Sequence, residues 1–144
     1  MLRDERLIEA AATMGDYLAR GLNGLKAKYP KTVLEVRGRG LFQGIRLNFQ
    51  QDLAAKLVDI AKNPLFLTYQ TVLISGMTRE LYDRHDILAH FQPGARDILH
   101  FMPPMVIRTE HIDRLIAALD AILAKGVAET TLSFVAKNIK SVFA

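Results

Sequence analysis

Apolar residues recur every three or four positions in several stretches of the chain, which is the spacing of one helix face. The clearest stretches are 4–28, 51–62 and 109–125, and each is followed closely by a proline or a glycine. We expect two further helices, over residues 67–84 and 129–144, although the first of these is rich in β-branched side chains. The pattern therefore predicts a chain with substantial helix.

The helix predicted over 109–125 has the clearest boundaries. Thr109 is placed to cap its N-terminus, acidic residues occupy its first turn, and Gly126 ends it. Its apolar stripe is a core-facing surface made of six residues: Ile112, Leu115, Ile116, Leu119, Ile122 and Leu123. In the first helix, three glycines each weaken the helix by roughly 1 kcal/mol relative to alanine, so packing must hold it: Gly15, Gly21 and Gly24.

Two strand pairs are expected between the helices. Residues 32–37 and 41–48 read as a hairpin around Gly38-Arg39-Gly40, and residues 87–92 and 97–102 as a second pair around 93–96. If Gln92 pairs with Asp97, both faces of the second pair are largely apolar, and His90 and His100 lie on opposite faces. A small sheet in water commonly keeps one polar face, so we expect another domain to cover the second face.

Composition narrows the class of protein. Half of the 144 residues are hydrophobic, which suits one domain spanning residues 1–144. Cysteine is absent, the first residues are too charged for a signal peptide, and the apolar stretch 53–76 is interrupted by charges and Pro64. We expect a cytoplasmic protein that does not bind membranes. The net charge of +4 comes from scattered basic residues, so we expect no nucleic-acid partner.

No catalytic or metal-binding motif stands out. The histidines lack a ligand spacing such as His-x-x-x-His, so we expect no metal site. The segment Gly38-Arg39-Gly40 is followed by a strand rather than a helix, so it predicts a turn and not a phosphate loop. The serines lie in apolar helical patterns, which gives no argument for a Ser-His-Asp triad.

Two segments resemble motifs of one family. Residues 97–113, with Phe101-Met102-Pro103-Pro104 between a strand and a helix start, resemble the "hydrophobic-Arg-Phe-x-Pro-Pro-hydrophobic" end of the class III aminotransferases of the ornithine and acetylornithine type. Residues 36–47, with the run Gly38-Arg39-Gly40-Leu41, resemble that family's "Val-Arg-Gly-x-Gly-Leu-hydrophobic-x-Gly-Ile-x-Leu" hairpin. The motifs stand in the family's order, and the resemblance reaches from the first helix to about Lys125.

The resemblance implies the C-terminal small domain of a fold-type I enzyme. Its expected fold is α/β, a small, mostly antiparallel sheet with helices mainly on one face. It implies an aminotransferase that moves an amino group between a small-molecule donor and a 2-oxo acid, that uses pyridoxal phosphate, and that works as a homodimer. The cofactor would be held by a large domain that is not in this chain, so we expect this fragment alone to bind no cofactor and to be inactive. No lysine here resembles the family's Schiff-base motif.

The resemblance also singles out His100, which stands where those family members carry arginine before the Phe-x-Pro-Pro run. We expect His100 to be a substrate-binding residue, and we expect no catalytic, cofactor-binding or metal-binding residue in this chain. Imidazole is mostly neutral near pH 7 and has at most two donors, whereas guanidinium is a charged fork. This difference argues against ornithine or acetylornithine as substrate. The alternative is a histidine that simply packs beneath a domain interface.

Two other functions stay open at this point. An aminomutase or decarboxylase of the same family would look the same, because the residues that select the reaction lie in the other domain. A free-standing, non-catalytic binding module could reuse the fold. Such a module would have to cover the second sheet face or make it polar.

Overall fold

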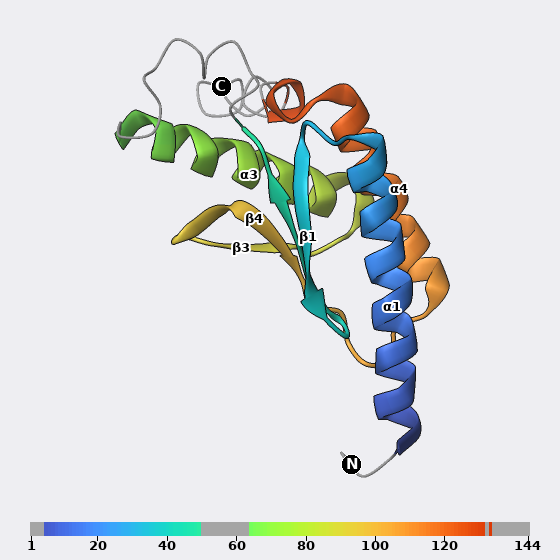
Figure 1. Cartoon of the computed structure of the whole chain (residues 1–144). Helices are drawn as coiled ribbons and strands as arrows, with labels where there is room; N and C mark the ends of the chain where they lie inside the picture. The colour runs from blue at the N-terminus through green and yellow to red at the C-terminus, as the bar shows by residue number, and fades with distance from the viewer. Residues whose placement is uncertain (1–4, 50–63, 132, 134–144) are drawn as a thin grey trace.

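The computed structural model describes residues 5–49, 64–131 and 133 of the chain (Figure 1). The elements follow in the order α1 (Glu5–Lys28), β1 (Val33–Arg39), β2 (Phe42–Leu47), α3 (Pro64–His85), β3 (His90–Gln92), β4 (Ala95–Phe101) and α4 (Thr109–Lys125). Residues 127–131 and 133 are also helical. The helix predicted over 51–62 and the end of the one predicted over 129–144 lie outside the described residues. Within the described ranges, no helix is long and apolar enough to cross a membrane.

The strands form one antiparallel sheet with the order β1-β2-β4-β3. Helices α1 and α4 lie side by side, and α3 packs on both α4 and β4 (Figure 1). The described helices therefore cover one face of the sheet, as the buried residues confirm: Leu18 and Leu22 of α1, Ile74 and Met77 of α3, Ile45 of β2, Leu99 of β4 and Leu119 of α4. This confirms the predicted α/β class with helices mainly on one face.

The helix boundaries differ slightly from the prediction. Arg108, in an extended conformation, is the N-cap of α4, and Thr109 is its first residue. The predicted N-cap is therefore wrong by one residue. The backbone N–H of Arg108 donates to Nδ1 of His111 at 3.3 Å, so a histidine at the third helical position accepts the N–H of the cap residue. Pro64 begins α3, a position where its missing N–H costs nothing. Gly126 ends α4 with a φ of 96°, as predicted.

The predicted register of the second strand pair is wrong by one residue. Its turn is only Pro93-Gly94, with Gln92 opposite Ala95, and an irregularity follows between Phe91 and Gln92. Phe91 therefore pairs with Leu99, and His90 pairs with His100. Because side chains alternate along a strand, this single step moves one whole strand to the other face relative to its partner. His90 and His100 lie on the same face, not on opposite faces.

The hairpin of β1 and β2 also turns slightly later than expected, at Gly40 and Leu41, and it touches α1 there. Gly40 has a φ of 55°, which glycine adopts without strain. A Cβ at Gly15 of α1 would lie only 2.3 Å from the carbonyl carbon of Gly40. Gly15 therefore allows the backbone of α1 to contact the backbone of the turn directly. Gly24, later in the same helix, faces open space.

We predict opposite effects from two alanine substitutions in α1. Gly15→Ala forces the hairpin away from the helix and should lower the free energy of unfolding by about 2 kcal/mol or more. Gly24→Ala, the matched control, gains helix propensity without a clash and should raise it by about 0.5 to 1 kcal/mol. Urea unfolding followed by circular dichroism measures both. Equal effects of the two substitutions would show that α1 does not depend on this contact.

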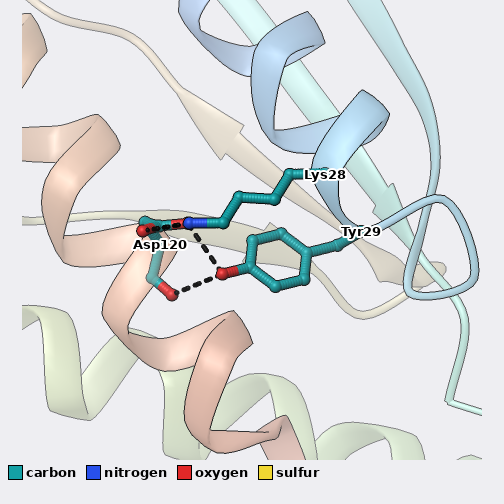
Figure 2. Close-up of polar contacts among 3 residues, drawn as sticks. All are labelled: Lys28, Tyr29 and Asp120. Carbon is teal, nitrogen blue, oxygen red and sulfur yellow. Dashed lines mark hydrogen bonds and ion pairs between the residues drawn. The ribbon is translucent and has the colours of Figure 1, made fainter.

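A polar cluster joins the end of α1 to α4 (Figure 2). The Lys28 ammonium donates to both carboxylate oxygens of Asp120 at 2.8 Å, and the Tyr29 hydroxyl donates to Asp120 Oδ1 at 2.8 Å. These bonds, from Lys28 first and then Tyr29, hold the pKa of Asp120 below its ordinary value. Lys28 is correspondingly held charged, because Asp120 raises its pKa. The cluster is a clamp between two helices.

The clamp should depend on pH. Tyr29→Phe removes one hydrogen bond to a carboxylate and should cost about 1 kcal/mol of unfolding free energy at pH 7. Since the pKa of Asp120 is lowered in the folded state, its contribution is complete above the unfolded value and is lost as the pH falls through the folded value. The cost of Tyr29→Phe should therefore be constant near neutral pH and should shrink as the pH falls below the unfolded value of 3.8. Tyr82→Phe, at an exposed tyrosine of α3, is the control; a pH-independent cost at Tyr29 would contradict the clamp.

Candidate functional site

The face of the sheet that the described helices leave uncovered carries mostly polar side chains. Because Val36, Ile45 and Leu99 pack into the core, their neighbours along each strand point the other way. We call this the open face; its residues are Glu35, Arg37, Phe42, Gly44, Arg46, His90, Ile98 and His100. The sequence predicted that the second strand pair would be largely apolar on both faces. The observed register places His90 and His100 together on the open face of that pair, and Glu35, Arg37 and Arg46 of the other hairpin supply most of the polar side chains.

Within the open face, one row of residues crosses all strands of the sheet. Arg37 of β1 is opposite Gly44 of β2, Gly44 is opposite His100 of β4, and His100 is opposite His90 of β3. We call these four residues the His100 row. The row places the predicted substrate-binding residue in the middle of the sheet, with a basic or ionisable side chain on each side.

Gly44 lies beside both Ile98 and His100 of β4. A Cβ at Gly44 would lie 3.2 Å from Cγ2 of Ile98, which is a tight contact, and 3.4 Å from Cδ2 of His100, which is an ordinary one. Glycine inside a strand often marks such a close approach. The imidazole stacks on Phe42, with ring centroids 5.7 Å apart and ring planes 2° from parallel. Phe42 is 52% exposed, so its ring covers the histidine while remaining at the surface.

The environment of His100 favours its neutral form. Burial lowers the pKa of His100, and the nearby positive charges of His90 and Arg37 lower it further. The His90 ring lies 6.4 Å from the His100 ring, centroid to centroid, and is tilted by 40°. Nδ1 of His100 is buried and makes no hydrogen bond to any described residue. At neutral pH this side chain is an uncharged imidazole.

Arg37, opposite Gly44, and Arg46, two residues after Gly44, are already paired with carboxylates of this chain. The Arg37 guanidinium donates to Glu35, and this bond holds the pKa of Glu35 below its ordinary value. The Arg46 Nε donates to Asp97 at 3.0 Å, and a second nitrogen of Arg46 lies 3.9 Å from Glu35. Each of these two guanidinium groups already has a carboxylate partner within this chain. The centre of the open face therefore offers an aromatic ring and a neutral imidazole, not a charged fork.

The described residues do not form a site for a pyridoxal cofactor. Such a site needs a lysine that can be neutral, an acidic partner for the ring nitrogen and a cradle for a phosphate. Lys28 is exposed and held charged by Asp120, and the other lysines in the described ranges, Lys26, Lys31 and Lys125, lie on α1, α4 or the turn after α1 rather than in the His100 row. Nor do three His, Asp or Glu side chains of the described part gather closely enough to hold a metal ion.

A separate hollow of about 370 Å³ lies at the Pro-Pro turn. It is lined largely by apolar residues, among them Leu18, Leu88, Met102 and Pro103, and His100 is not among them. The lining also includes His111 and the ion pair in which Arg114 donates to Asp86 at 3.0 Å. The sequence pointed to His100 but missed its neighbours Phe42 and Gly44 as part of one site. The glycine inside a predicted strand was the available signal, and the register was needed to use it.

Comparison with known proteins gives one consistent result. A family model described as aminotransferase class-III matches residues 1–123. Ornithine aminotransferase 1 of Staphylococcus aureus is 34% identical over 118 residues, which cover 82% of this chain and 23% of the relative. Acetylornithine aminotransferase of Thermosynechococcus vestitus is 28% identical over 123 residues, which cover 85% of this chain and 24% of the relative.

The solved structures agree with this assignment. Lysine aminotransferase from M. tuberculosis in the internal aldimine form aligns with a TM-score of 0.62 and 29% identity, covering 83% of this chain and 22% of that one. The chain thus spans about a quarter of the length of the relatives it matches. Since the family model covers most of the chain, this chain belongs to the class-III aminotransferase family.

Proposed function

We propose that residues 1–144 are the C-terminal domain of a pyridoxal-phosphate-dependent aminotransferase that moves an amino group between an amine or amino acid and a 2-oxo acid. The observation that carries the proposal is the family match over residues 1–123. The relatives named above, both aminotransferases, and the short span of this chain within them support it. The large domain of the same enzyme is the proposed partner, in a homodimer. The cytoplasmic location predicted from the sequence is part of the same proposal.

The side chains of this chain suggest different roles for the two domains of the enzyme. The described lysines do not form a cofactor site, so the cofactor and the residues that react on it belong to the large domain. This chain would contribute a surface that faces the substrate and helps to exclude water. His100 is the residue we assign to substrate, because it stands in the family's arginine position and at the centre of the open face. Its neutral imidazole favours donors without a distal carboxylate.

A free-standing binding module is the second candidate, and one observation favours it. The open face is polar, with Glu35 bound to Arg37 and Arg46 bound to Asp97, so the fold can meet water on this side without a partner. The coding sequence immediately upstream distinguishes the two candidates. A lysine-bearing large domain in the same reading frame supports the aminotransferase, whereas an independent start and stop support the module.

We predict that the 144-residue chain alone binds no pyridoxal phosphate. Titration of the chain with the cofactor, followed by visible absorbance, should show only weak, non-saturable reaction with exposed lysines. Reduction with borohydride and peptide mapping should give scattered labels. A saturable signal with the label on a single lysine would contradict the proposed division between the two domains.

His100→Arg should change the donor preference of the intact enzyme. A guanidinium can bind a distal carboxylate through two charged hydrogen bonds, worth on the order of 1.5 to 3 kcal/mol, where imidazole offers less. The ratio of kcat/KM for two donors that differ only in that carboxylate should therefore rise about tenfold or more. His90→Arg, which adds the same charge one strand away, is the control. If neither His100→Arg nor His100→Ala alters the ratio, His100 is only an interface residue.

A further inference from the structure

The His100 ring is stacked on one residue of β2. His100 is opposite Gly44 in the sheet. Phe42, two residues before Gly44 on the same face, lies almost parallel to the imidazole, with the ring centroids 5.7 Å apart. The stacked ring limits the freedom of the imidazole to turn.

The two ring nitrogens of His100 differ in their surroundings. Nδ1 is buried without a hydrogen-bond partner among the described residues, whereas Nε2 is not buried in this way. A neutral imidazole carries its proton on one nitrogen only. A buried N–H without an acceptor is less favourable than a buried lone pair, and an N–H that reaches the surface can bond to water or to a ligand. The arrangement thus favours the proton on Nε2.

We propose that Phe42 is a positioning residue that holds the His100 ring in one orientation, with its proton on Nε2 directed to the open face. This row then presents a single neutral N–H donor beside an aromatic ring. Toward a ligand, it selects an uncharged acceptor, such as a carbonyl or hydroxyl oxygen, next to an apolar or planar group. The ligand role rests on the proposed function, but the positioning does not, because it concerns only residues of this chain.

The groups around His100 are consistent with a neutral donor. His90 and Arg37 flank it in the His100 row, and both disfavour a second positive charge. Glu35 could offset such a charge, but it is bonded to Arg37 and also lies near Arg46. Asp97 is bonded to Arg46. The acidic groups on and beside this part of the face are thus engaged with arginines rather than with the imidazole.

Nuclear magnetic resonance of the 144-residue chain tests the positioning directly. Long-range proton–nitrogen correlation spectra identify which ring nitrogen carries the proton, and a pH titration gives the pKa of His100. The parent chain should show His100 with its proton on Nε2 and a pKa below the ordinary value for histidine. Its ring protons should also show the upfield shift that a stacked aromatic ring produces.

Three variants separate positioning from general destabilisation. Phe42→Ala should remove the upfield shift, raise the pKa of His100 toward its ordinary value and give a mixture of the two neutral forms. Phe42→Tyr keeps the stacked ring and should restore the parent behaviour. Leu34→Ala, at an exposed apolar residue of β1, should change neither property. Because Phe42 is half exposed, its loss should leave the fold intact.

The proposal is overturned if the parent chain carries the proton on Nδ1, or if Phe42→Ala leaves the His100 spectrum and pKa unchanged. Failure of the proposed function looks different. In that case the spectra behave as expected, but donor preference in the intact enzyme does not respond to substitutions at His100. The two experiments therefore judge the positioning and the ligand role separately.

Discussion

The burial of one sheet face beneath α1, α3 and α4 is the constraint on which the rest of the structure depends. Side chains alternate along a strand, so burying Ile45 and Leu99 in the core turns Gly44 and His100 outward. The pairing of the strands then brings those outward residues into line across the sheet. The site is thus a consequence of how the core packs, and a shift of one residue in any strand would dismantle it.

The helices could be predicted from the sequence because their signals are local. In α4 the apolar stripe and Gly126 lie within one segment, and five of the six stripe residues are buried while Ile116 packs against the core. The register of β3 and β4 could not be predicted in the same way. It depends on a two-residue turn and an irregularity beside Gln92, which change the pairing without changing the apolar pattern. The place of His90 beside His100 follows from that register.

A sequence motif singled out His100 as a candidate residue. Its protonation state could not be predicted from that motif. Whether a histidine is charged depends on what surrounds it in space. Here its neighbours are Phe42 from β2, His90 from β3 and Arg37 from β1, and no local pattern connects these strands to His100. The same holds for the arginines. Arg37 and Arg46 add to the positive charge of the sequence, but in the fold Arg37 pairs with Glu35 and Arg46 pairs with Asp97.

The pairing of those arginines also explains how the open face can be stable both in water and against another domain. In water, ion pairs on an exposed sheet face keep it soluble and discourage strands from other molecules. Against another domain, these two pairs stay satisfied within this chain, so covering Arg37 and Arg46 does not leave their charges unpaired. His100 differs, because its buried Nδ1 has no hydrogen-bond partner among the described residues. With the proton on Nε2, as proposed, a covering domain or a substrate meets one neutral donor here rather than a cation, so this is the position where the surface can discriminate between ligands.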